Sequence, residues 1–205
     1  QVDLNGNLGG SATIDNATLN LAADVSAGVT VNAGGNLTGA GTLGSLDVVG
    51  GTVTPGASLG TLDITGDVTF DGSSTYAVEV QAALDGGTAS DTLAVGGTAL
   101  FNSGATIDVS QFGGGSAIDI SEVFTIVTAS DFGATDINQI NLNSTVAGTS
   151  FELNISGGTD LQLLVNPTVT WTGAGNGTEW ADPTNWDNDP QLNDQDLGSQ
   201  VRVFG

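Results

Sequence analysis

The sequence predicts an all-β protein with the architecture of a parallel β-solenoid, in which successive turns of the chain stack on one another. Strong helix formers are scarce: the 205 residues include no Met and a single Lys or Arg, whereas Gly contributes 32. Apolar and polar residues alternate in short runs that end at Gly, Asn or Asp, which is the pattern of half-buried strands. A short segment also recurs along the chain, as a solenoid requires.

The recurring segment is clearest in the first half of the chain. Leu43–Gly50 reads LGSLDVVG, and Leu59–Gly66 reads LGTLDITG 16 residues later. Val29–Gly34 is a weaker, earlier copy. A further echo follows after 31 residues, where Leu93, Val95, Gly97 and Phe101 repeat the spacing of Leu62, Ile64, Gly66 and Phe70. Because a sandwich of antiparallel sheets usually has no repeat at so short a period, we favour the solenoid.

Alternation within these copies predicts which side chains form the core. In a solenoid, equivalent residues of successive turns lie about 4.8 Å apart and form ladders inside the tube. Gly and Asn suit the corners because they tolerate positive φ. Asp47 and Asp63 occupy matching positions of the copies, so we expect them to stack on the outer face. The side chains expected to point inward are Leu46, Val48, Leu62, Ile64, Val68, Phe70, Leu93, Val95 and Phe101.

The second half of the chain is less regular. After the break at Gly113–Gly115, the apolar run Val123–Val127 predicts a strong strand. Residues 130–148 show weak alternation, and we interpret them as a looser excursion. The final turns of the solenoid are expected at Val123–Val127, Phe151–Ile155, Leu161–Val165 and Val169–Trp171.

The last segment of the chain differs in composition from the rest. It contains all three tryptophans, Trp171, Trp180 and Trp186, together with two of the four prolines. We therefore divide the chain into a β-solenoid over residues 1–168 and, over residues 169–205, a C-terminal cap or the opening of a further unit. The tryptophans are expected to close the apolar end of the solenoid, where open strand edges need protection; the alternative is that they stack on sugars.

The formal charge of −22 excludes several classes of partner. Nucleic-acid binding and electrostatic binding to anionic lipids both need a cationic surface. No apolar stretch approaches the roughly 20 residues of a membrane-spanning helix, so we expect no direct membrane insertion. An acidic surface does attract cations, and alternating Asp and Asn oxygens suit Ca²⁺. The densest acidic cluster gives four candidate Ca²⁺ ligands, Asp187, Asp189, Asp194 and Asp196. Their spacing lacks the Gly and Glu of an EF-hand loop, so a solvated loop is the alternative.

Most catalytic chemistry is excluded by the residues that the chain lacks. There is no His, Cys or Lys, which removes Ser-His-Asp, Cys-His, Schiff-base and His-metal mechanisms. Arg202, in the tail, is the single basic side chain that could take a proton in a lyase. Stacked carboxylates such as Asp47 and Asp63 could hydrolyse a glycoside, but a solvated acidic ladder is the simpler interpretation. We therefore expect no enzyme, and no cofactor other than Ca²⁺.

Residues 51–70 resemble a repeat found in the passenger regions of bacterial autotransporters. The match runs in order through Pro55–Ser58, which reads PGAS, and Gly60–Leu62, which reads GTL. The tail is similar to the opening of autotransporter-associated β-strand repeats at Trp171–Gly173 and Asn185–Trp186. This resemblance implies an extracellular, right-handed β-helix but no single activity, because such a fold carries many functions.

These observations predict a structural or adhesive shaft segment of a bacterial surface protein or secreted protein. Two alternatives remain open: a self-assembling extracellular filament subunit, whose copies join end to end through β edges, and a carbohydrate-binding or glycan-active module. The expected partners are accordingly a second copy of the chain, a host surface or a glycan. The expected location is extracellular or on the bacterial cell surface.

Overall fold

The computed structural model describes residues 1–82, 89–114, 118 and 122–167, and this part of the chain is all-β. Besides strands it contains two short 3-10 helices, η1 (Phe112–Gly114) and η2 (Ile137–Gln139). No helix in these ranges is long and apolar enough to cross a membrane. The prediction of an all-β protein with parallel strands is therefore confirmed.

The strands form two sheets. Along sheet A the order is β1 (Val2–Leu4), β3 (Thr18–Leu21), β5 (Asn36–Gly39), β7 (Thr52–Pro55), β10 (Thr75–Gln81), β14 (Thr106–Gln111) and β16 (Asn141–Ser144), all parallel. A short antiparallel strand, β11 (Ala89–Ser90), pairs with the end of β10. Sheet B contains β2 (Ala12–Ile14), β4 (Val25–Asn32), β6 (Thr42–Val49), β8 (Thr61–Ile64), β9 (Val68–Phe70), β12 (Thr92–Val95), β13 (Ala99–Phe101), β15 (Val123–Thr128), β17 (Thr149–Ser156) and β18 (Asp160–Pro167).

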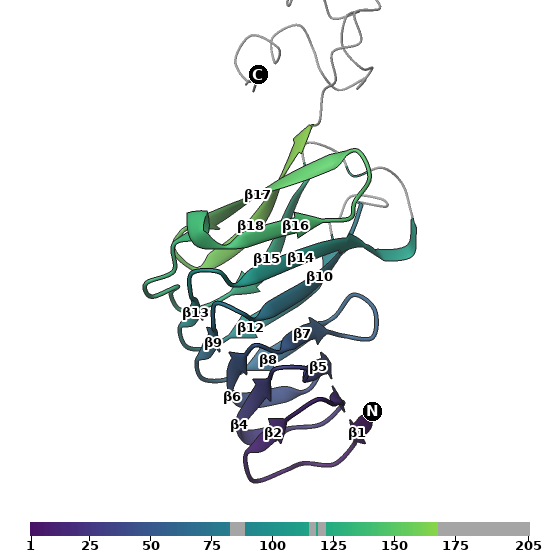
Figure 1. The fold of residues 1–205 in the computed structure, drawn as a ribbon, viewed down its shortest axis with the longest axis vertical. Helices are drawn as coiled ribbons and strands as arrows, with labels where there is room; N and C mark the ends of the chain where they lie inside the picture. Colours follow the sequence, from purple (N-terminus) through teal and green to yellow (C-terminus); the bar gives the residue numbers. More distant parts are fainter. Residues whose placement is uncertain (83–88, 115–117, 119–121, 168–205) are drawn as a thin grey trace, which may run out of the picture.

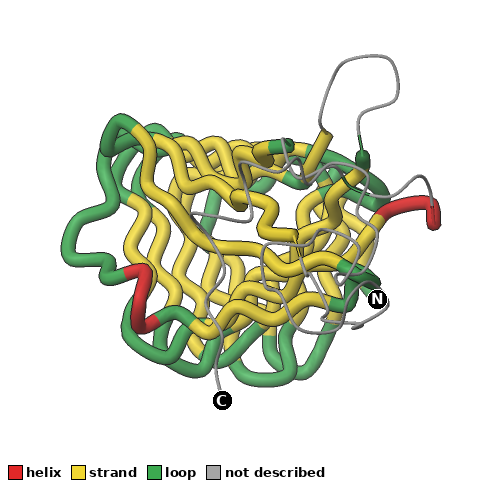
Figure 2. The backbone as a smooth tube through the Cα atoms, turned by 90° about the horizontal axis from the view of Figure 1, so that it is seen from above, coloured by secondary structure: helices red, strands yellow, loops and turns green. Residues whose placement is uncertain are grey.

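The chain passes through sheet A and then through sheet B, and we call one such passage a circuit. The circuits stack along the long axis of the molecule, from β1 and β2 at one end to β16, β17 and β18 at the other (Figure 1). Seen along this axis, the strands of successive circuits overlie one another around a common interior (Figure 2). The apolar side chains of both sheets form one core cluster in that interior.

Parallel pairing brings equivalent apolar residues of successive circuits into ladders. One ladder of sheet B consists of Ile14, Val31, Val48, Phe70 and Phe101. Its last two rings are stacked, with centroids 4.6 Å apart. The corresponding ladder of sheet A consists of Leu19, Leu37, Val53, Tyr76, Ile107 and Leu142. All nine side chains predicted to point inward are buried, the most exposed being Val95 at 6%, so this prediction is confirmed.

The 16-residue repeat of the sequence is not the register of the sheets. Leu46 pairs with Val68 and not with Leu62, its counterpart in the repeat. The reason is that β6 is long enough to pair with both β8 and β9, because a turn divides the next circuit into these two short strands. The 31-residue echo does match the register, since Leu62 pairs with Leu93 and β9 pairs with β13.

The expectation that the chain ends in further parallel turns is wrong for residues 149–167. β17 and β18 form an antiparallel hairpin, and β18 also pairs antiparallel with β15. The hairpin turn contains Gly157 (φ 62°) and Gly158 (φ 81°), whose left-handed backbone reverses the chain at once. So short a turn cannot lead to a parallel strand, which needs a crossover of a dozen or more residues.

Residues 130–148 are more ordered than the predicted looser excursion. The N-terminus of η2 is capped by Asp136, whose side chain accepts a hydrogen bond from the backbone N–H of Asn138. β16 follows and extends sheet A beside β14. Alternation was weak in the sequence because β16 contributes a single apolar side chain, Leu142, to the edge of the core.

Candidate functional site

Acidic side chains in the described part of the chain bind backbone N–H groups and hydroxyls at the corners of the stack. Asp71 accepts hydrogen bonds from the Gly50 N–H (3.1 Å), the Ser73 N–H (2.9 Å) and the Ser74 hydroxyl (2.6 Å). Burial acts to raise the pKa of Asp71, but these hydrogen bonds outweigh it and the pKa is lowered. Ser74 is itself fully buried, and its hydroxyl lies 2.6 Å from the Val48 carbonyl oxygen. Asp71 therefore fixes a corner to the preceding circuit.

A second series of polar contacts links three consecutive circuits. The Thr98 N–H donates to the Asp67 carboxylate at 2.8 Å, and the Thr98 hydroxyl lies 3.2 Å from the Asp131 carboxylate. Asp131 also accepts a hydrogen bond from the Gly133 N–H at 2.8 Å. These carboxylates are thus used within the fold. In the described ranges, no three His, Cys, Asp or Glu side chains are grouped so that they could hold a metal ion.

Asp91 is the most deeply buried carboxylate of the described residues, with no exposed surface. One of its oxygens accepts a hydrogen bond from the Gly60 N–H and the other accepts one from the Glu79 N–H, both at 2.9 Å. Burial raises the pKa of Asp91 to about 6 in spite of these two bonds, and the nearby charge of Glu79 adds to the rise. Because Gly60 precedes β8 and Glu79 lies in β10, Asp91 ties adjacent circuits together.

Tyr76 lies in the core next to Asp91 and is also fully buried. Its hydroxyl donates to the backbone carbonyl of Ile126 at 2.8 Å, which connects β10 of sheet A to β15 of sheet B. Burial raises the pKa of Tyr76 well above its usual value, and the Asp91 charge adds to this. Neither group reaches solvent, so the pair stabilises the core and cannot act on an outside substrate.

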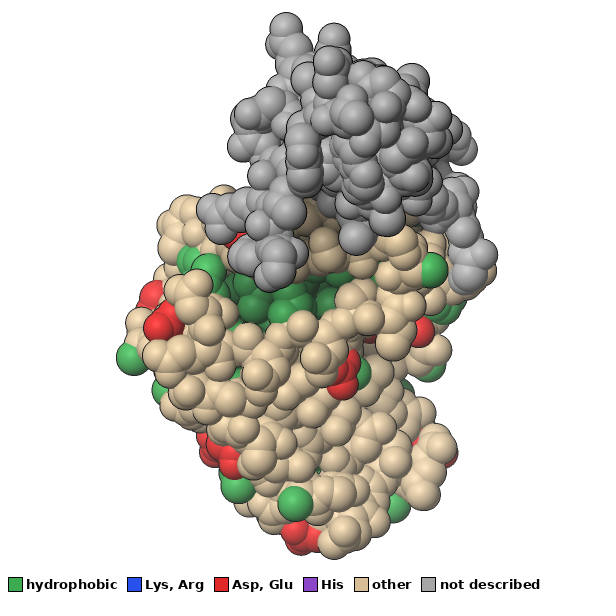
Figure 3. Space-filling model, turned by 45° about the horizontal axis from the view of Figure 1, so that its top comes forward, with side chains coloured by type: hydrophobic (Ala, Val, Ile, Leu, Met, Phe, Trp, Pro, Cys, Tyr) green, Lys and Arg blue, Asp and Glu red, His purple; other side chains and the backbone are tan. Residues whose placement is uncertain are grey.

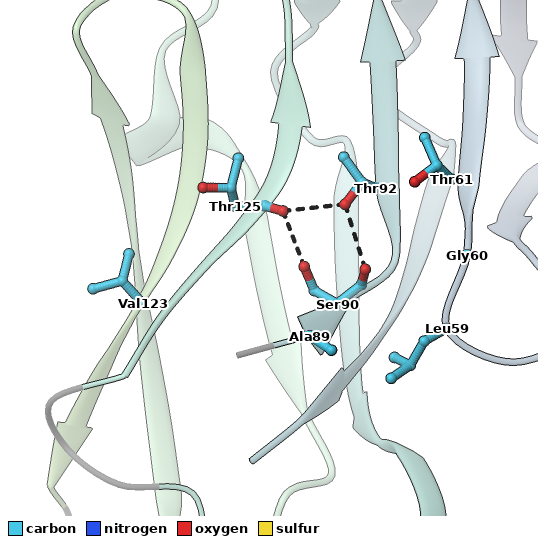
Figure 4. Close-up of a pocket in the computed structure, with 8 residues that line it drawn as sticks. All are labelled: Leu59, Gly60, Thr61, Ala89, Ser90, Thr92, Val123 and Thr125. Carbon is cyan, nitrogen blue, oxygen red and sulfur yellow. Dashed lines mark hydrogen bonds between the residues drawn. The ribbon is translucent and has the colours of Figure 1, made fainter. Parts of the chain in front are cut away.

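A shallow groove of about 440 Å³ crosses the outer face of β8, β12 and β15 (Figure 4). Its lining consists of Leu59, Gly60, Thr61, Ala89, Ser90, Thr92, Val123 and Thr125. The Ser90 and Thr92 hydroxyls lie 2.9 and 3.3 Å from the carbonyl oxygen of Thr125, and so connect β11 and β12 to β15 (Figure 4). The lining side chains include no acid, base or aromatic ring. The groove could contact a neutral, hydroxylated ligand, but it supplies no group for acid–base or nucleophilic catalysis.

The outer face of sheet A carries an uncharged column of short polar side chains. The register stacks Thr18, Asn36, Thr52, Thr75, Thr106 and Asn141 in consecutive strands. Unequal spacing along the chain hides this column in the sequence. In the described ranges, the Asn36 Oδ1 atom is the buried side-chain oxygen that lacks a hydrogen-bond partner.

The sequence-predicted site residues have different outcomes. Asp47 and Asp63 are exposed as expected but do not stack, because Asp47 pairs with Thr69 and Asp63 pairs with Ala94. The proposed pair of glycosidase carboxylates is therefore not brought together. The remaining candidates lie outside the described residues: the Ca²⁺ ligands Asp187, Asp189, Asp194 and Asp196, the tryptophans Trp171, Trp180 and Trp186, and Arg202.

The sequence analysis missed the buried polar residues Ser74, Tyr76 and Asp91. Ser74 and Asp91 each come directly before a strand, at positions where polar residues usually mark an exposed turn. The alternation around Tyr76 does place its ring in the core, but a single sequence gives no sign of its hydrogen-bond partner 50 residues away.

Comparison with known proteins adds no family to these observations. No protein-family model matches the chain, and no curated protein matches it. The resemblance to autotransporter passenger regions therefore stays a prediction.

Proposed function

We propose that the chain is a right-handed parallel β-solenoid that serves as a structural shaft segment of a bacterial surface or secreted protein. The observation that carries this proposal is the in-register parallel pairing of sheet A, which continues from β1 to β16 without a register shift. Each circuit rests on the one before it, so the chain extends along a single axis. A shaft needs this geometry and needs no catalytic residue.

Three features of the protein suit a shaft. Backbone hydrogen bonds and apolar ladders run along the stacking axis, so both resist separation of the circuits. Asp71, Asp91 and Asp131 fix the corners to neighbouring circuits. The charge of −22 keeps copies apart by repulsion and favours solubility. A shaft of this kind is stabilised by its stacked circuits and requires no disulfide, which agrees with the absence of Cys from the sequence.

The proposal is tested on the purified full chain, first by its shape and then by its activity toward glycans. Small-angle X-ray scattering and negative-stain images should show an elongated, monodisperse particle, and a crystal structure should show right-handed winding. A glycan array and a screen for glycoside hydrolysis should both be negative. Hydrolysis of any glycan, or saturable glycan binding that is lost in Thr92→Val within the groove, would replace the shaft by the carbohydrate-active alternative.

The end-to-end filament is a second candidate, favoured by the free edges at the first end of the stack. In the described ranges, β1 pairs with β3 alone and β2 pairs with β4 alone, so each has one open edge. Val2 is 59% exposed on the first of these strands. Open edges are templates for pairing with another chain. Analytical ultracentrifugation at high salt decides this case: filaments that disappear in Asp3→Pro would support it, and a monomer at all concentrations would remove it.

A further inference from the structure

The corner between β1 and β2 contains an asparagine that is followed by a glycine. Asn5 and Gly6 are both exposed. Apart from the two residues beside Gly6 in the chain, no heavy atom lies within 4 Å of the place that a Cβ atom of Gly6 would occupy. No other asparagine in the described ranges precedes a glycine. Glycine has no Cβ atom to shield its nitrogen or to restrict its backbone, so the preceding side-chain amide can approach that nitrogen.

Neither of the two groups that would meet is held by a hydrogen bond within the described part of the chain. The Asn5 side-chain amide has no partner there, and the Gly6 N–H donates to no carbonyl oxygen. Asn143, which is followed by the small residue serine, differs in this respect. Its side-chain amide donates a hydrogen bond to the Asp108 carboxylate at 2.8 Å. The amide of Asn5 is therefore free to change its orientation, whereas that of Asn143 is fixed on a strand.

The chain is fixed on both sides of this Asn-Gly pair. The Leu4 carbonyl oxygen accepts a hydrogen bond from the Ala22 N–H at 3.1 Å, and the Leu8 N–H donates to the Asp24 carbonyl oxygen at 2.9 Å. The residues between these two hydrogen bonds form an exposed bend, and exposed bends of small polar residues change conformation at little cost. The asparagine side chain can therefore turn back onto the next backbone nitrogen while β1 stays paired with β3.

We propose that Asn5 is a site of self-modification, at which the asparagine converts to aspartate and isoaspartate. The Gly6 backbone nitrogen loses its proton and bonds to the Cγ atom of Asn5, while the Cγ–Nδ2 bond breaks and the side-chain nitrogen leaves with that proton as ammonia. Water then opens the resulting cyclic imide at either of its two carbonyl carbons. One opening gives aspartate, and the other gives isoaspartate, in which the backbone runs through the former side chain. The reaction needs water alone as a co-reactant, and nothing is oxidised or reduced.

The conversion changes the charge at the first end of the stack and leaves the fold in place. The new carboxylate lies two residues from Asp3, which is also exposed. The described part of the chain contains no Lys or Arg that could neutralise it, and the face in Figure 3 shows acidic side chains without a basic one. Isoaspartate also adds one atom to the backbone, which the open space around Gly6 accommodates. The modified chain is therefore still folded but more acidic beside the open edge of β1.

Incubation of the full chain at 37 °C tests the proposal. Mass spectrometry of chymotryptic peptides locates the change, and an isoaspartyl methyltransferase labels the isomerised product. Asn5 should convert several-fold faster than Asn143, and faster at pH 8.5 than at pH 6.5, because the attacking nitrogen must lose its proton. Gly6→Ala should slow the conversion several-fold, since a Cβ atom hinders the approach. Gly10→Ala, in the same corner and with equal space around it, should leave the rate unchanged.

A synthetic peptide of residues 2–10 gives the rate in an unfolded chain, and circular dichroism shows that the incubated protein keeps its strands. An Asn5 that stays intact in the folded chain while the peptide converts would overturn the proposal. So would equal rates in the wild type and in Gly6→Ala. The second Asn-Gly pair of the sequence, Asn176–Gly177, lies outside the described residues and gives a separate peptide, so it does not enter the comparison.

Discussion

At the scale of single residues, the buried charge of Asp91 is stabilised by backbone N–H groups within the described part of the chain. The single Lys or Arg of the chain is Arg202, which lies outside the described residues. The described part of the chain therefore contains no Lys or Arg side chain that could pair with a buried carboxylate. Asp91 is instead satisfied by two backbone N–H groups, and the half-buried Asp71 is satisfied by two N–H groups and two hydroxyls. Such carboxylates couple stability to hydrogen-bond geometry and to pH.

Folding should depend on pH through Asp91. Its pKa is raised from 3.8 to about 6 in the native state, so the native state binds this proton more tightly than the unfolded chain does. The stabilisation that protonated Asp91 gives to the native state is therefore fully present below pH 3.8 and is lost as the pH rises through about 6. The free energy of unfolding changes by at most about 3 kcal/mol over this range. When the pH is lowered from 7.5 to 5, the Tm of the wild type should rise more than the Tm of Asp91→Asn. Equal rises in the two proteins would contradict this assignment.

The buried hydroxyl of Ser74 gives a second test at this scale. Ser74→Ala leaves the Gly50 N–H with one partner fewer and leaves the Val48 carbonyl without this contact. We expect a loss of about 1–3 kcal/mol in the free energy of unfolding, measured by urea denaturation. Ser58→Ala, at an exposed position, is the control and should change stability by less than about 0.5 kcal/mol. Equal effects would show that the Ser74 contacts are not important.

At the scale of the elements, each strand is stabilised by its place in a ladder. Ile64 of β8 is 1% exposed and pairs with Leu43 before it and Val95 after it. Ile64→Ala should therefore lower the free energy of unfolding by about 2–5 kcal/mol, through lost burial and an unfilled cavity. The control is Val49→Ala on β6, because Val49 is 47% exposed and should cost much less. A similar loss from both substitutions in urea denaturation would mean that the ladder does not control stability.

The β17–β18 hairpin offers a test of backbone conformation alone. A Cβ atom added at Gly158 would meet nothing within 4 Å, but the residue has φ of 81°. Gly158→Ala should therefore cost about 1–2 kcal/mol from the left-handed backbone without any clash. Gly9 has equal space around it and no positive φ, so Gly9→Ala should be close to neutral. Thermal unfolding of the two variants compares them, and a neutral Gly158→Ala would contradict the hairpin geometry.

The elements differ in how well a single sequence predicts them. Alternation identified inward residues of β8, β9 and β12, because their outer neighbours are polar or small. It also identified those of β6 and β13, although Val49 and Leu100 are apolar residues on the outer face. The register of the strands was harder to predict. The similarity of Leu43–Gly50 to Leu59–Gly66 suggested that Leu46 pairs with Leu62, but the turn between β8 and β9 places Val68 opposite Leu46. Local pattern also cannot distinguish parallel from antiparallel pairing, which is why β17 and β18 were misassigned. Asp91 could not be found because its partners are brought close only by the stacking.

At the scale of the whole molecule, self-repulsion opposes the ladders. With a charge of −22, the compact state should be destabilised at low ionic strength. Raising NaCl from about 0.01 to 0.15 M shortens the Debye length from about 30 to about 8 Å, and the Tm should rise by several degrees. Potassium chloride should give the same rise at equal ionic strength. A Tm that falls or stays constant would show that repulsion is already relieved in the fold.

The distance along the chain between paired residues of sheet A is larger near β16 than near β1. Val2 and Leu19, paired in sheet A, are 17 residues apart, whereas Ile107 and Leu142, paired in the same sheet, are 35 residues apart. The described residues between β14 and β16 include η1, β15 and η2, and the two strands still pair in parallel. Such a body can accept new loops of different length at its corners without a change in its interior. Peptides or small domains inserted at Ala57, an exposed corner position, would then be displayed at a fixed height on a rigid support.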